Sequence, residues 1–201
     1  MKKSSVILSY NLQEYFKAEV EEATNTLGLE LDDLLEYYLV NMLCDFSRAE
    51  QAPKPGAEPL AFIYKRAIEA QPAERVGALK ELGDIALYVA GFFTEFIERS
   101  LVDIDYYISM GGGAYANLSK LIGSQPSGDT FAELYEAMAT RFAELVDVLN
   151  EMSSKVVQPT SDTDLLRLYD RWNRTGSQRL EKELFSRGLI PHVVGGTDFV
   201  Q

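Results

Sequence analysis

Hydrophobic residues recur every three or four positions along most of this chain, which is the period of an α-helix. The first such pattern predicts a helix that begins at a capping box formed by Asn11 and Glu14. The same helix is expected to end at Gly28, because glycine accepts the left-handed backbone found at many helix ends. Its apolar positions are Leu12, Tyr15, Phe16, Val20, Ala23 and Leu27.

Prolines and glycines mark the limits of the next helices. A second helix is expected to begin near residues 32–33 and to end before residues 51–59, QAPKPGAEP, which predict a mobile loop. A shorter helix follows over about 60–70. Pro72 suits the first turn of the next helix, where its missing N–H removes no hydrogen bond, and that helix is expected to run to Phe93.

The second half of the chain continues the helical pattern. Helices are expected over 95–110, 114–122 and 130–152, the last one opened by a capping box of Thr130 and Glu133. Further apolar positions around Trp172 and before Gly188 continue the pattern, and no convincing strand occurs. The sequence therefore predicts an all-α fold, a bundle of six to eight helices.

The length and composition favour one folded domain. A chain of 201 residues, 46% of them hydrophobic, is long enough to bury a substantial core. We expect a single α-helical domain over residues 1–190 and a short extended tail over 191–201, since PHVVGGTDFVQ leaves the helical pattern.

Charge and cysteine content limit the partners and the compartment. A formal net charge of -12 opposes nucleic acids and anionic membrane surfaces, which attract Lys and Arg. The longest apolar run, residues 85–93, is too short to span a bilayer, and Cys44 has no second cysteine to pair with. We therefore expect a cytoplasmic protein without a nucleic-acid or membrane partner.

The low content of histidine and cysteine excludes several kinds of site. With one His and one Cys, the chain cannot assemble a Cys/His zinc site or a catalytic metal site that needs two or three His ligands. His192 lies in the expected tail and Cys44 on an apolar helix face, so neither predicts a nucleophilic site. No cofactor is expected.

Residues 78–122 contain glycines within helical patterns. Gly83, Gly91 and the run 111–113 each lower helix stability unless close packing or a bend requires them. We interpret them as close helix contacts. The alternative is that the 111–113 run presents backbone N–H groups to an anion at the start of the helix that follows.

The same segment carries the candidate site residues, which are carboxylates and tyrosines. They are Glu81, Asp84, Asp103, Asp105, Tyr106, Tyr107 and Tyr115. They could form a polar pocket in an apolar bundle, because a buried tyrosine hydroxyl seeks a hydrogen-bond partner. The alternative is a buried hydrogen-bond network that fixes helix register.

Two resemblances to known families involve this segment. KELGDIALYV resembles the second acidic helix motif of the MazG-like nucleotide pyrophosphohydrolases, which implies that Glu81 and Asp84 bind Mg²⁺ for hydrolysis of a nucleoside triphosphate. In the upstream stretch LAFIYKRAIEA, Phe62, Tyr64 and Lys65 stand where that family has acids. The combination of ELGDIALYVAGFF, LVDIDYYISMGGGAY and LYDRWNRTGSQRL resembles an uncharacterised family of bacterial all-helical proteins, which implies a helical fold and assigns no activity to the chain.

The sequence leaves three functional hypotheses. The first is a non-enzymatic module that binds a protein partner or associates with itself, because the chain has eleven Tyr and ten Phe, and aromatic residues are enriched in interface cores. The same aromatics could instead fill the protein's own core. The second hypothesis is a Mg²⁺-dependent phosphohydrolase that uses Glu81 and Asp84. The third is a bundle that binds a small molecule or a lipid, with the helix of IALYVAGFF as one wall.

Overall fold

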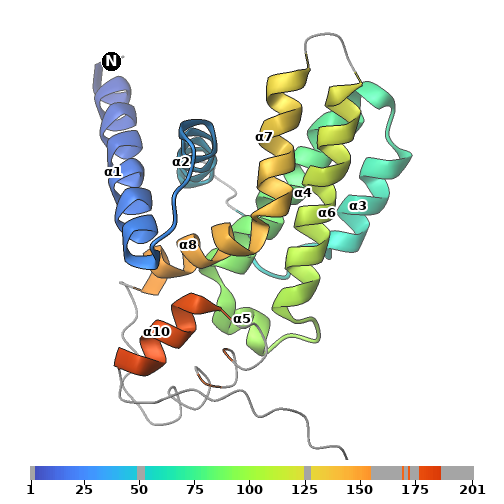
Figure 1. Ribbon diagram of the computed structural model, residues 1–201. Helices are drawn as coiled ribbons and strands as arrows, with labels where there is room; N and C mark the ends of the chain where they lie inside the picture. The colour runs from blue at the N-terminus through green and yellow to red at the C-terminus, as the bar shows by residue number, and fades with distance from the viewer. Residues whose placement is uncertain are drawn as a thin grey trace, which may run out of the picture. The chain divides into compact units, whose positions relative to one another are not determined.

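Helices form the whole of the architecture that this computed structural model describes, which covers residues 3–48, 53–124, 128–154, 169, 172 and 177–186. Within these residues there are nine helices and no strand, which confirms the all-α prediction (Figure 1). The chain divides into two compact units, residues 1–153 and 154–201, and each is described by itself. The expected single domain over 1–190 stays a prediction, and the expected tail over 191–201 lies outside the described residues.

The first two helices pack against each other. α1 (Lys3–Leu27) begins eight residues before the expected capping box, so the prediction of a start at Asn11 is wrong. Its end is as expected, since Gly28 has a φ of 68° and two backbone hydrogen bonds close the last turn. α2 (Asp33–Arg48) begins where predicted, because the Asp32 carboxylate accepts a hydrogen bond from the Leu35 N–H.

The next two helices also begin where the prolines predict. α3 (Leu60–Glu69) follows Pro59, and α4 (Pro72–Phe92) has Pro72 in its first turn. α3 packs along α4, and α4 packs along α6 (Ile104–Gly123) (Figure 1). Part of the expected mobile loop, residues 51–52, lies outside the described residues.

The expected helix over 95–110 is wrong, because the chain turns twice in this region. α5 (Thr94–Glu98) begins directly after Phe93, and buried Thr94 donates a hydrogen bond to the Asn150 side-chain oxygen. Asp103 then caps α6 by accepting from the Tyr106 N–H. α6 runs through Gly111 to Gly113 without a break, whereas two separate helices were expected here.

The expected helix over 130–152 is two helices. α7 (Asp129–Thr140) and α8 (Phe142–Ser154) meet at Arg141, and α8 runs across the direction of α7 (Figure 1). The Thr140 hydroxyl donates to the carbonyl oxygens of Glu136 and Ala137, a back-bond of the kind that bends helices. The capping box at Thr130 is also wrong, since Gly128 occupies the N-cap position and no side chain caps it.

The glycines confirm the prediction of close helix contacts at three positions. A Cβ at Gly83 would lie 2.5 Å from the Tyr115 ring, one at Gly91 2.3 Å from the Leu149 Cβ, and one at Gly111 2.3 Å from Phe142. A Cβ at Gly113, in contrast, would meet nothing within 4 Å. Hence α6 and α8 both approach α4 at positions that only glycine permits.

The two units have separate apolar cores. In residues 1–153, buried side chains from α1 through α8 form one continuous core. In residues 154–201, Leu180 and Leu184 of α10 (Gln178–Ser186) pack with Trp172 and Tyr169. Among the described residues, no helix has the length and apolar character that crossing a membrane requires.

Candidate functional site

Asp84 of α4 is a buried carboxylate at the centre of the larger unit, and its side chain is 8% exposed. Its Oδ1 accepts hydrogen bonds from the hydroxyls of Tyr38 in α2 and Tyr115 in α6, both at 2.6 Å. Its Oδ2 accepts one from Lys80 Nζ at 2.6 Å. Three donors on three helices therefore compensate the cost of removing this charge from water.

Aromatic rings surround the carboxylate. Tyr135 of α7 stacks on Tyr115 with ring centroids 5.9 Å apart, and it meets Tyr38 edge to face at 5.7 Å. Lys80 Nζ lies 5.2 Å from the Tyr38 ring centre, close enough for a cation–π contact. We call Tyr38, Lys80, Asp84, Tyr115 and Tyr135 the Asp84 cluster.

Burial and the charge of Asp84 together set the pKa values of its hydrogen-bond donors. Burial raises the pKa of Tyr38 and of Tyr115, and the Asp84 charge raises both pKa values further. Burial by itself lowers the pKa of Lys80, but the charge and hydrogen bond of Asp84 outweigh it and the pKa is raised. The tyrosines therefore stay protonated donors and Lys80 stays a cation at neutral pH.

The space for this cluster comes from a glycine. Gly83 precedes Asp84, and the Tyr115 ring occupies the position where a side chain at 83 would begin. Tyr115 is fully buried, so its hydroxyl has to find a partner inside the protein. Gly83 thus allows the ring to approach α4 closely enough for the hydroxyl to reach Asp84.

The remaining predicted site residues lie elsewhere. Asp103 and Tyr106 are at the start of α6, and nine residues of helix, about 14 Å, separate Tyr106 from Tyr115. The Tyr106 hydroxyl accepts a hydrogen bond from the Ala61 N–H in the first turn of α3, which has no side-chain cap of its own. Tyr107 is buried beside Tyr106 with ring centroids 5.6 Å apart.

Glu81 and Asp105 are exposed. The seven predicted residues therefore do not form one pocket. Asp84 is hydrogen-bonded to Tyr115 in one place. Asp103, Tyr106 and Tyr107 contact one another in a second place, at the start of α6.

Three members of the Asp84 cluster were missed in the sequence: Tyr38, Lys80 and Tyr135. Lys80 had a local signal, because a lysine four residues before an aspartate lies on the same helix face. Tyr38 lies 46 residues from Asp84, and no local pattern indicates that the two meet. The same is true of Tyr135, which reaches the cluster through the packing of α7 on α6.

The geometry of the Asp84 cluster suits a scaffold better than a metal site. Both Asp84 oxygens already accept hydrogen bonds, so a Mg²⁺ ion there would have to displace an ammonium group and two hydroxyls. Glu81, the expected second ligand, is exposed whereas Asp84 is buried. Within the described ranges, no group of three or more His, Cys, Asp or Glu side chains is placed to hold a metal ion.

A different feature stands out on the surface, over residues 96–102. Leu101 is fully exposed, at 107% of its reference area, and it lies in a stretch that contains both apolar and polar residues, FIERSLV. Phe96 and Val102 are 39% and 37% exposed, while Ile97 between them is buried at 3% and anchors the stretch. Exposed Asp103 and Asp105 follow directly. We call Phe96, Leu101 and Val102 the 96–102 patch.

Comparison with known proteins gives no match to this chain. No protein-family model matches it, and neither does any curated protein or any solved structure. The resemblances to MazG-like pyrophosphohydrolases and to bacterial all-helical proteins therefore stay predictions. Any function has to be inferred from the residues of the chain itself.

Proposed function

We propose that this chain is a non-enzymatic binding module that recognises a protein partner through the 96–102 patch. The observation that carries the proposal is the complete exposure of Leu101, next in sequence to Val102 and five residues after Phe96, which are each more than one-third exposed. Single exposed apolar residues are normal on a protein surface, but neighbouring ones favour an interface. Burying a leucine side chain fully is worth about 1.5 to 3 kcal/mol.

The aromatic content supports the same proposal in part. Some aromatics fill the core, such as Tyr115 and Phe142, which are at most 1% exposed. Others are more than half exposed, and they are Tyr15, Tyr37, Phe62, Phe131 and Phe185. The core therefore does not account for all the aromatic residues of the chain.

Charge favours a partner other than a second copy of the chain. The net charge is -12, so two copies of the chain repel each other overall, although exposed Arg99 lies within the stretch that Asp103 and Asp105 follow. The partner that fits presents apolar side chains bordered by Lys or Arg. A protein fits better than a nucleic acid or an anionic membrane, which the same charge repels, and we place the interaction in the cytoplasm.

The test compares two substitutions that each remove an exposed apolar side chain. Leu101→Ser changes the patch, and Phe131→Ser changes an exposed residue of α7 outside it. The wild type and both variants serve as bait in extracts of the source cells. We expect a set of captured proteins that is lost with Leu101→Ser, is kept with Phe131→Ser, and is released by salt.

Two outcomes would overturn the proposal. One is an identical set of captured proteins for both variants. The other is a concentration-dependent dimer of the wild type in sedimentation velocity that Leu101→Ser abolishes, because the patch would then serve self-association.

A further inference from the structure

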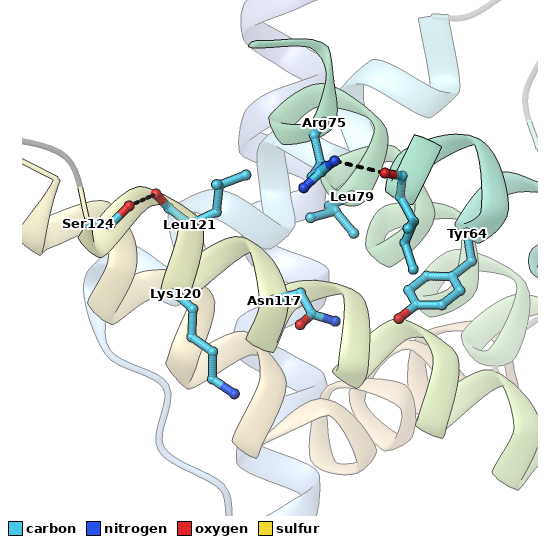
Figure 2. A pocket seen from close by; sticks show the side chains of 8 residues that line it. Tyr64, Arg75, Leu79, Asn117, Lys120, Leu121 and Ser124 are labelled. Carbon is cyan, nitrogen blue, oxygen red and sulfur yellow. Dashed lines mark hydrogen bonds between the residues drawn. The ribbon is translucent and has the colours of Figure 1, made fainter. Parts of the chain in front are cut away.

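A cavity of about 460 Å³ lies between α3, α4 and α6, away from the Asp84 cluster. α3 and α4 each contribute two residues one helical turn apart, Tyr64 with Ile68 and Arg75 with Leu79 (Figure 2). Asn117 and Leu121 of α6 repeat this spacing on the opposite wall. A cavity of this volume is in the range that holds a small organic molecule.

Among the residues that the structure describes, the charged ones that line this cavity are both cations, Arg75 and Lys120, and none is a carboxylate. This is unusual for a chain with a net charge of -12. Lys120 is exposed and forms no ion pair with any of the described residues. The cavity is therefore a local positive region on an acidic protein, and it attracts small anions.

Arg75 is held in place but is not neutralised. Its Nη2 donates to the carbonyl oxygens of Ile68 at 2.8 Å and of Ala70 at 3.1 Å, so the end of α3 fixes the guanidinium. Its Nη1 makes no hydrogen bond to a described residue and is the nitrogen left for a ligand, since its Nε has no acceptor but is buried out of reach of solvent. An immobilised guanidinium with unused donors is the group that proteins favour for binding carboxylates and phosphates.

The rest of the lining is amphipathic. Ile68, Leu79 and Leu121 supply the apolar part of the lining. The Tyr64 hydroxyl and the Asn117 amide are polar groups on facing walls (Figure 2). We propose that this cavity binds a small organic anion, with a carboxylate or phosphate head held by Arg75 and an apolar body against the three aliphatic side chains. Lys120, which Figure 2 shows on the other side of α6 from Arg75, adds positive charge to the lining. The proposal does not depend on the 96–102 patch.

The test uses isothermal titration calorimetry on the full chain with three probes. Two are anions with an apolar body, 4-phenylbutyrate and phenyl phosphate, and they distinguish the carboxylate from the phosphate as the preferred head. The third, 4-phenylbutan-1-ol, has the same kind of body and no charge. We expect saturable binding of at least one anion, with a dissociation constant about tenfold below that of the alcohol and rising with NaCl.

The variants separate the site from the net charge. Lys120→Gln should weaken anion binding about fivefold, because Lys120 is exposed, and Arg75→Gln by about tenfold or more. Lys65→Gln removes the same charge from an exposed position of α3 outside the cavity lining and should leave binding unchanged. Circular dichroism checks that each variant is folded, and Lys120→Gln serves if Arg75→Gln does not fold.

Three results would overturn the proposal. They are the absence of saturable heat from both anions, equal binding of the neutral alcohol, and anion affinities that Lys120→Gln and folded Arg75→Gln leave unchanged.

Discussion

Arg75 and Asp84 are two charged residues of α4, nine positions apart, and their surroundings differ. Asp84 is buried and accepts hydrogen bonds from two tyrosines and a lysine. Arg75 is half-buried, donates to two carbonyl oxygens, and has no carboxylate partner among the described residues. A buried charge whose partners are all internal stabilises packing, whereas a fixed charge beside a cavity remains available to a ligand.

The largest effect expected from this comparison is at Asp84. Asp84→Ala would leave the Tyr38 and Tyr115 hydroxyls buried without their acceptor, and we expect it to lower the free energy of unfolding by about 3 to 5 kcal/mol. Urea unfolding followed by circular dichroism measures this. Glu81→Ala, which removes an exposed acid from the middle of the same helix, α4, should change the same quantity by less than about 0.5 kcal/mol. Equal losses for the two variants would contradict the structural role of Asp84.

A smaller effect is expected at two glycines of α6 that are two residues apart. Gly111→Ala forces a Cβ against the buried Phe142 ring and should lower the free energy of unfolding by about 1 to 3 kcal/mol. A Cβ at position 113 would meet nothing within 4 Å. Because alanine has a higher helix propensity than glycine, Gly113→Ala should raise the free energy of unfolding by about 0.5 to 1 kcal/mol. Opposite signs would support the close contact at 111. If both substitutions stabilised the protein, α6 would not lie as close to Phe142 as described.

The tyrosines of the Asp84 cluster predict loss of stability at alkaline pH. Their pKa values are raised in the folded protein, so their contribution is complete below the unfolded value of 10.0 and is lost as pH rises above it. Above about pH 10 the unfolded chain binds fewer protons, and each buried tyrosine should lower the free energy of unfolding by up to about 1.4 kcal/mol per pH unit.

The measurement is urea unfolding from neutral to alkaline pH. Tyr115→Phe should remove one tyrosine's share of the slope, while Tyr37→Phe, an exposed tyrosine, should leave it unchanged. A slope that Tyr115→Phe does not alter would mean that this hydroxyl ionises as readily in the folded protein as in the unfolded one.

The smallest effect is expected from magnesium. Asp84 already accepts hydrogen bonds through both oxygens, so it has no free site for Mg²⁺. We expect MgCl2 to shift the melting temperature of the wild type no more than KCl of equal ionic strength does. The same result is expected for Asp84→Asn. A Mg²⁺-specific rise that Asp84→Asn abolishes would reverse the comparison, and it would favour the hydrolase that the MazG-like resemblance implies.

Much of the helical fold follows from local signals, and the boundaries that fail do so for physical reasons. Gly28 and Pro72 end and begin helices as expected, because each restricts its own backbone. The turns at Phe93 and Arg141 contain neither glycine nor proline, so helical periodicity runs through them in the sequence. They form because buried groups such as Thr94 and Phe142 have to reach partners in other helices.

The candidate site shows the same limit of local information. Asp84 and Tyr115 were predicted because their helices have unusual composition, and the structure brings them together. Tyr38 could not be predicted as a member, because an ordinary amphipathic pattern surrounds it and its contact spans 46 residues. Arg75 was not singled out either, since only the packing of three helices reveals a cavity beside it.

The hydrogen bond from the Ala61 N–H to the Tyr106 hydroxyl has a consequence for synthesis on the ribosome. The group that caps the first turn of α3 comes from α6, 45 residues later in the chain. At usual rates of translation, Tyr106 is made about two to nine seconds after Ala61. During that interval the start of α3 lacks its cap, so this turn is completed only when α6 packs against it.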